Sequence, residues 1–219
     1  MNLAEALIEF IFPPHCPVCG EYVKHKGFWC SECFRQTEEI RRLPLDAETF
    51  AVLDGVWSLG RYSDGLRTLL IPLKFNMKRD RLPYLQRFLA AAGENLPDEI
   101  KTAALSVPVP LHEEREKKRG FNQTELIFRQ WALEKGFSWQ RALVRTRSTV
   151  PQFGLGAEER SKNLSGAFAL SEHADVRGKS ILLLDDICTT GTTLRECAKV
   201  LRKGGARRVY GLVLSSDRG

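Results

Sequence analysis

Two aspartates and a threonine-rich loop are the chemically most informative stretch of the chain. Asp185 and Asp186 follow a run of branched apolar residues, and the next loop sets hydroxyl side chains around one glycine: Thr189, Thr190, Gly191, Thr192 and Thr193. Backbone amides and threonine hydroxyls donate hydrogen bonds to a phosphate, and a glycine lets the backbone approach it. Carboxylates repel phosphate, so the aspartates suit sugar hydroxyls or a metal-bound water better. The combination predicts a ribose 5-phosphate site, and the alternative is a polar turn between strand and helix.

Four cysteines near the start of the chain have the spacing of metal ligands. They form two Cys-x-x-Cys pairs separated by a short insert, namely Cys16, Cys19, Cys30 and Cys33. Each pair can turn two thiolates toward one point, and two pairs complete the tetrahedral coordination that Zn²⁺ prefers. Such a closed site leaves no position for substrate, so we expect a structural zinc. Free thiols or redox pairs are the alternative, with His15 and His25 as candidate substitute ligands.

Basic side chains accompany two other segments. Lys74 lies in a basic connector between two predicted helices, and Arg115 and Arg119 belong to a basic cluster just before residues 120–123. Guanidinium groups grip phosphates bidentately, so these residues suit the neutralisation of a polyanion. A solvated basic surface is the alternative.

These groups need a scaffold that places them together, and the sequence predicts a parallel sheet. The apolar run over 180–184 is typical of a strand buried on both faces, and residues 194–201 repeat apolar side chains at helical spacing. In an open parallel sheet, ligands bind beyond the carboxyl ends of the strands. Further strands are predicted at 56–62, 103–110, 143–145, 166–170 and 209–214, and helices at 82–92 and 123–134. Prolines should confine strand 103–110 to a sheet edge or lie at its end.

The stretch from Asp185 to Thr193 resembles the binding motif for 5-phosphoribosyl 1-diphosphate (PRPP) in type I phosphoribosyltransferases. Other stretches resemble the ComF family of competence-associated proteins over nearly the whole chain: Leu73-Lys74-Phe75, Val107 to Leu111, Arg119 to Gln123, Pro151-Gln152, Arg160, Asn163 and Gly166-Ala167-Phe168. The resemblance implies an α/β fold whose type I phosphoribosyltransferase-like core has a mainly parallel sheet, plus a small N-terminal zinc module with four cysteine ligands. It also implies binding of PRPP with Mg²⁺.

The resemblance further assigns a role to the loop after strand 103–110. That loop, which contains Pro110, Leu111 and His112, would bind the diphosphate through backbone amides around a strained or cis peptide bond.

A second loop, which follows residue 145, has little apolar periodicity. By resemblance it is a flexible lid over PRPP, with Gln152, Arg160 and Asn163 as contacts; a plain surface loop is the alternative. If the protein is an enzyme, a nucleophile displaces pyrophosphate at the anomeric carbon, and Asp185 and Asp186 are its catalytic residues.

The length of the chain allows one sizeable core with a small appendage. We expect residues 1–50 to form an N-terminal helix, the zinc module and a linker, and residues 51–219 to form the phosphoribosyltransferase-like domain. The apolar residues of 2–12 suit a short amphipathic helix that docks on the zinc module or another subunit, with a membrane surface as the alternative. No apolar run approaches the roughly 20 residues of a membrane span, and no signal peptide is recognisable. The expected location is cytoplasmic, either free or peripheral to the inner face of the membrane.

A formal net charge of +6 and an isoelectric point near 9.1 fit contact with phosphates or nucleic acid. Two functions are therefore carried forward. One is Mg²⁺-dependent phosphoribosyl transfer from PRPP or binding of another ribose 5-phosphate. The other, which the resemblance to ComF proteins implies, is a non-catalytic adaptor in DNA uptake whose ribose-phosphate pocket senses a metabolite or receives a nucleic-acid end. Its partners would be single-stranded DNA and a competence helicase. An oligomer is compatible with either function.

Overall fold

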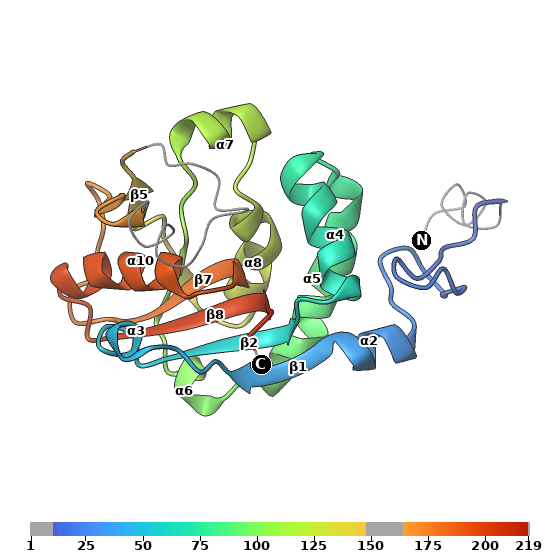
Figure 1. Cartoon of the computed structure of the whole chain (residues 1–219), viewed down its shortest axis with the longest axis horizontal. Coiled ribbons are helices and arrows are strands. Elements are labelled where there is room, and N and C mark those ends of the chain that lie inside the picture. Colours follow the sequence, from blue (N-terminus) through green and yellow to red (C-terminus); the bar gives the residue numbers. More distant parts are fainter. Residues whose placement is uncertain (1–10, 148–163, 219) are drawn as a thin grey trace.

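The computed structural model describes residues 11–147 and 164–218, and a six-stranded sheet lies at its centre (Figure 1). The strand order is β1-β2-β8-β7-β3-β4, and all neighbours are parallel except β1, which is antiparallel to β2. The strands of this sheet are β1 (Glu38–Arg42), β2 (Gly55–Arg61), β3 (Leu105–Pro108), β4 (Ser138–Trp139), β7 (Ser180–Cys188) and β8 (Arg208–Ser216). A separate antiparallel pair joins β5 (Leu143–Arg145) to β6 (Phe168–Leu170). The prediction of a mainly parallel sheet is confirmed.

Helices cover both faces of the sheet (Figure 1). The helices of the described residues are α2 (Ser31–Thr37), α3 (Ala47–Phe50), α4 (Asp64–Phe75), α5 (Leu82–Ala92), α6 (Asp98–Lys101), α7 (Glu113–Arg119), α8 (Gln123–Glu134) and α10 (Thr192–Lys203), with 3-10 turns η1 (Arg79–Arg81) and η2 (Gly93–Asn95). Within these residues, every helix is too short or too polar to cross a membrane.

The side chains of β7 alternate between two hydrophobic cores, as the period of a strand requires. Leu182 and Leu184 pack in the core that contains α4, α5 and α8. Ile181 and Leu183 pack in the other core, which contains α10 and the β5–β6 pair. The strand is thus buried on both faces, as the apolar run predicted.

Helix α10 confirms the predicted helical spacing. Its residues Leu194, Cys197, Ala198 and Leu201 are buried and share one face. The helix ends at Gly204, followed by Gly205 with φ +92°, a backbone conformation that favours glycine.

Residues 35–50, the last part of the segment 1–50 that was expected to end in a linker, form regular structure. They contribute β1, the antiparallel edge strand of the main sheet, and the short helix α3. Asp46 caps α3 by accepting a hydrogen bond from the Thr49 N–H at 2.8 Å. Strand β1 was not predicted because its sequence is charged. Charged residues are tolerated there because the strand is only partly buried at the edge of the sheet.

Two expected elements lie outside the described residues. These are most of the N-terminal helix predicted for 2–12 and most of the lid after residue 145, with its predicted contacts Gln152, Arg160 and Asn163.

Candidate functional site

The two aspartates lie within the carboxyl-terminal half of β7 rather than after the strand, since β7 continues to Cys188. Because successive strand residues face opposite sides, Asp185 lies on the α10 side and Asp186 on the α4 side. Asp185 is 9% exposed and Asp186 only 2%. Two buried carboxylates at a strand end are costly unless a partner or ligand compensates them.

The two carboxylate oxygens of Asp186 have different surroundings. Its Oδ1 lies 2.9 Å from Nζ of Lys74, at the end of α4. Its Oδ2 is buried and has no hydrogen-bond partner among the described residues. Arg119 of α7 adds a second positive charge near this carboxylate. A buried acceptor without a donor fits a hydroxyl or a bound water of a ligand.

Asp185 is surrounded differently. Its Oδ1 accepts the N–H of Asp186 at 2.9 Å. Burial raises the pKa of Asp185 well above its ordinary value, and the charge of Asp186 adds to this, while Lys74 opposes it. Arg145 of β5 interacts electrostatically with Asp185, and burial lowers the pKa of that guanidinium.

The threonine loop leads directly into α10. Gly191 has φ +82° and is the N-cap residue, with no side-chain cap on the helix. Its carbonyl accepts the N–H of Arg195 at 2.9 Å, and the hydroxyls of Thr190 and Thr192 lie 2.9 Å apart. Thr189 and Thr193 are half-buried beside them. The loop therefore presents hydroxyls and the first-turn amides of a 12-residue helix, a combination that suits a phosphate.

The loop after β3 lies beside the aspartates. Pro108 pairs with Leu184, and the N–H of Val109 donates to the Leu184 carbonyl at 2.9 Å. Asn122 connects the start of this loop to α8. Its Nδ2 donates to the Val109 carbonyl at 3.0 Å, and its Oδ1 caps α8. The predicted prolines fall at the end of β3, which is an inner strand.

The expectation of a cis or strained peptide in this loop is wrong. The described residues contain no cis peptide bond, and Pro110, Leu111 and His112 have no positive φ. The hydrogen bonds of Val109 and Asn122 hold the loop in ordinary geometry. Pro110 and Leu111 themselves are half-buried.

Arginines from two elements gather beside this loop. Arg115 and Arg119 lie on α7, and Arg119 is hydrogen-bonded to Gln123. Arg145 pairs with His112 through an isolated parallel bridge, so β5 runs alongside the loop. The sequence did not identify Arg145 as a site residue, because it indicated only that this residue belongs to a short strand. The remaining predicted cation, Arg160, lies outside the described residues.

A cavity of about 300 Å³ adjoins the same loop on the β5 side. Pro110, Leu111 and Arg145 form part of its wall, and Arg141 forms another part. Arg141 bridges Glu116 and Glu125 at 3.1 and 2.6 Å. The space therefore lies next to the loop rather than over the threonines.

The four cysteines form one cluster, as predicted. The Sγ atoms of Cys16, Cys19, Cys30 and Cys33 all lie within 4.8 Å of one another. The Cys19 and Cys30 sulfurs are 3.6 Å apart. Zn–S bonds of about 2.3 Å in a tetrahedron place sulfurs about 3.8 Å apart, so the cluster fits structural zinc.

The electrostatics of the cluster also favour a metal. Burial opposes ionisation of Cys16, but the N–H groups of residues 18, 19 and 30 outweigh it and lower the thiol pKa to about 7. In Cys33, burial raises the pKa well above its ordinary range. A bound cation stabilises the thiolate form of these cysteines, which offsets the opposition of burial to their ionisation.

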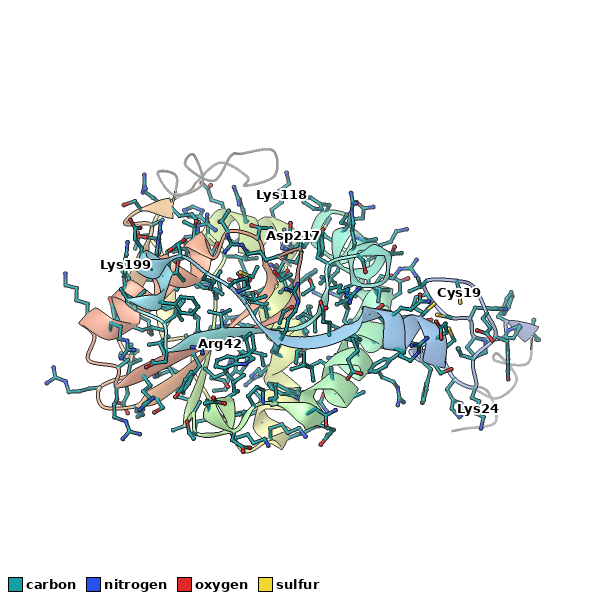
Figure 2. The ribbon with its side chains drawn as sticks, turned by 60° about the horizontal axis from the view of Figure 1, so that its bottom comes forward. Cys19, Lys24, Arg42, Lys118, Lys199 and Asp217 are labelled. Atoms are coloured by element: carbon teal, nitrogen blue, oxygen red, sulfur yellow. The ribbon has the colours of Figure 1, made fainter. Side chains whose placement is uncertain are left out.

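The zinc module lies at one end of the molecule. Figure 2 shows Cys19, near other sulfur atoms, and Lys24 at the end remote from Lys199 on α10. Lys118, on α7, lies toward the top of the same view. The module packs on α5, where Trp29 Nε1 donates to the Tyr84 carbonyl at 2.9 Å.

Two family models match the chain. The phosphoribosyl transferase domain model matches residues 133–218, and the double zinc ribbon domain model matches residues 7–44. The first match contains the aspartates and the threonine loop, and the second contains all four clustered cysteines. Within the described residues, this zinc-ribbon segment forms one four-cysteine cluster.

Curated relatives cover nearly the whole chain. DNA utilization protein YhgH of Escherichia coli is 32% identical over 203 residues, which cover 89% of this chain and 80% of that protein. Competence protein F of Haemophilus influenzae is 29% identical over 205 residues, with coverages of 91% and 84%. A hypoxanthine phosphoribosyltransferase structure from Staphylococcus aureus is 14% identical, covers 60% of this chain and 62% of that chain, and has a TM-score of 0.39. With its phosphoribosyl transferase match, its zinc-ribbon match and these relatives, the chain belongs to the ComF family of competence-associated proteins.

Proposed function

We propose that the protein binds PRPP with Mg²⁺ at the junction of β7 and α10. The observation that carries the proposal is Asp186 Oδ2, a buried carboxylate oxygen without a partner among the described residues, at the strand end that precedes the threonine loop. Asp185 and Asp186 hold the ribose hydroxyls. The 5-phosphate binds to the loop residues Thr189, Thr190, Gly191, Thr192 and Thr193.

The diphosphate binds to the loop of Pro110 and Leu111. The cations that neutralise it come from several elements: Lys74, Arg115, Arg119, Arg145 and, from outside the described residues, Arg160. Arginine forks match the geometry of phosphate oxygens, and several cations together suit the high negative charge of a diphosphate.

The residues present also fit Mg²⁺ supplied with the ligand. Mg²⁺ keeps several waters and is usually held by substrate phosphates plus one or two carboxylates. The partnerless oxygen of Asp186 can accept a hydrogen bond from such a water. Bound Mg²⁺ would supply neutralisation of charge on a departing pyrophosphate.

We further propose that the protein transfers the phosphoribosyl group and releases pyrophosphate. In this reaction the bond between the anomeric carbon and the diphosphate oxygen breaks, and the acceptor supplies the electron pair of the new bond. The protein contributes position and charge: the aspartates orient the ribose, and Arg115, Arg119 and Arg145 stabilise the leaving group.

A calorimetric titration with PRPP, with and without Mg²⁺, tests the binding proposal. We expect saturable binding that is stronger with Mg²⁺ and lost when Asp185→Asn and Asp186→Asn are combined. Circular dichroism should show that the double variant stays folded. Wild-type protein without PRPP affinity under either condition contradicts the proposal. Pyrophosphate release in the presence of some acceptor separates an enzyme from a binding protein.

The second candidate is an adaptor in DNA uptake, favoured by relatives named DNA utilization protein and competence protein and by the net charge of +6. Its partners are single-stranded DNA and a competence helicase. We expect binding of a labelled oligonucleotide to weaken with salt and to be unaffected by the double aspartate substitution. Absence of such binding at low salt argues against this role.

A further inference from the structure

Helix α4 connects the zinc module to the acidic pair. Its first turn contains Gly65, where a Cβ would lie 2.4 Å from Thr37 Oγ1 and 3.1 Å from the Trp29 ring. Its last turn contains Lys74, whose ammonium contacts Asp186. The 12-residue helix spans about 18 Å, so its packed start sets where the Lys74 side chain begins.

The contact between Lys74 and Asp186 is partly buried. The side chain of Asp186 is 3% exposed and that of Lys74 is 21% exposed, at a separation of 2.9 Å. A buried carboxylate without a cation is strongly destabilising, so Lys74 compensates Asp186 while no ligand is present. The partial exposure of Lys74 leaves its flexible four-carbon stem room to turn.

The loop that we propose for the diphosphate begins next to the strand segment that carries Asp186. Pro108 of β3 pairs with Leu184, two residues before Asp186, and the N–H of Val109 donates to the Leu184 carbonyl at 2.9 Å. Other charged and titratable groups around the aspartate pair come from four elements: Arg119 on α7, Arg145 on β5, Cys188 on β7 and Cys197 on α10. Lys74 is in direct ion-pair contact with Asp186 at 2.9 Å.

We propose that Lys74 is an exchangeable counterion that selects for the diphosphate of the ligand. In the ligand-free protein it pairs with Asp186. When PRPP binds, the ribose hydroxyls take its place on the carboxylate and the ammonium turns to the diphosphate. This inference rests on the proposed PRPP site and specifies how that site distinguishes PRPP from ribose 5-phosphate.

The exchange predicts that loss of the Lys74 ammonium changes the affinities for the two ligands differently. When ribose 5-phosphate binds, its hydroxyls displace Lys74 from Asp186, and the ammonium finds no diphosphate to pair with. When PRPP binds, the ammonium loses its ion pair with Asp186 but forms a new one with the diphosphate. Removal of the ammonium should therefore weaken PRPP binding while leaving ribose 5-phosphate binding unchanged or tighter.

The experiment is calorimetry of both ligands, each with Mg²⁺, on wild type, Lys74→Met and Lys74→Arg. A charged hydrogen bond contributes roughly tenfold or more in affinity. We expect Lys74→Met to lose about tenfold or more in PRPP affinity, and Lys74→Arg to keep most of the preference for PRPP. If Lys74→Met does not fold, Lys74→Gln serves instead, because its amide still donates to Asp186 without a charge.

Lys101→Met is the matched control. Lys101 also pairs with an aspartate at 2.9 Å, but on exposed α6. Lys101→Met should leave the ratio of the affinities for PRPP and ribose 5-phosphate unchanged. If Lys74→Met weakens the binding of both ligands equally, the role of the lysine is structural and the inference is overturned. An unchanged affinity for both ligands would also overturn it. Wild type that binds neither ligand instead refutes the proposed function itself.

Discussion

Asp185 and Asp186 are adjacent in the chain, but their side chains lie on opposite faces of β7. Asp186 forms an ion pair with Lys74 on the α4 side, whereas Asp185 lies on the α10 side, where it interacts electrostatically with Arg145 of β5. The two acids therefore differ in environment although they share a backbone. They should also differ in their response to neutral substitution.

Asp185→Asn should stabilise the ligand-free protein at neutral pH. Burial and then the charge of Asp186 raise the native pKa of Asp185, whereas an unfolded aspartate titrates near about 3.9. The native state thus binds a proton that the unfolded state releases, so this contribution to stability is present below about pH 4 and is lost as pH rises through the native pKa. The asparagine removes that loss, and its Oδ1 still accepts the Asp186 N–H. We expect a gain of roughly 1–3 kcal/mol near pH 7.

Thermal and urea unfolding of both proteins between about pH 5 and about pH 8 measure this effect. The difference in stability between variant and wild type should grow with pH, while PRPP binding is lost. Asp186→Asn is the comparison: it breaks the ion pair with Lys74 and should cost about 1–3 kcal/mol. A destabilised Asp185→Asn at every pH contradicts the assignment.

Loss of the metal should unfold the zinc module. Cys16→Ser removes a buried ligand with a lowered pKa, so we expect zinc content to fall from about one per chain to near zero. Trp29, which packs beside Phe88, should report the change in fluorescence. Cys197→Ala is the control, because Cys197 is equally buried but lies in α10, and it should keep full zinc content. Retained zinc in Cys16→Ser argues against tetrahedral four-cysteine coordination.

Much of the core was predictable from local pattern. The bounds predicted for α8 coincide with Gln123–Glu134, and the apolar run of β7 and the spacing in α10 identified the central strand and its helix. The continuous apolar run and the helical spacing both arise from burial and are local, so a single sequence contains them. The four cysteines were predictable for the same reason: their spacing is local.

Features that depend on distant partners were not predictable. Strand β1 is a charged edge strand, and only its pairing with β2 identifies it. Arg145 gains its place from the bridge to His112, a residue 33 positions earlier in the chain. The basic turn at Lys74 suggested a phosphate contact, whereas the fold places this side chain on Asp186. The roles of the ligand-binding residues remain predictions.

Gly191→Ala should disturb the threonine loop beyond the cost of its backbone. Gly191 has φ +82°, and a Cβ there would lie 3.1 Å from Leu45 Cδ2. Gly136 has φ +84° but nothing within 4 Å of an added Cβ, so Gly136→Ala isolates the backbone cost of about 1 kcal/mol. We expect Gly191→Ala to lose more stability than this control and, unlike it, to weaken PRPP binding. Equal effects of both substitutions on stability and binding would show that the loop tolerates the methyl group.

Trp29→Phe tests how firmly the zinc module is fastened to α5. Trp29 Nε1 donates to the Tyr84 carbonyl, whereas the buried Nε1 of Trp131 has no hydrogen-bond partner among the described residues. Both indoles pack on phenylalanine rings, so Trp131→Phe matches the loss of ring area without the loss of a hydrogen bond. Trp29→Phe should therefore cost about 1 kcal/mol more than Trp131→Phe in urea unfolding. If the two variants unfold at the same urea concentration, the Tyr84 hydrogen bond contributes nothing and the module is held by its aromatic packing alone.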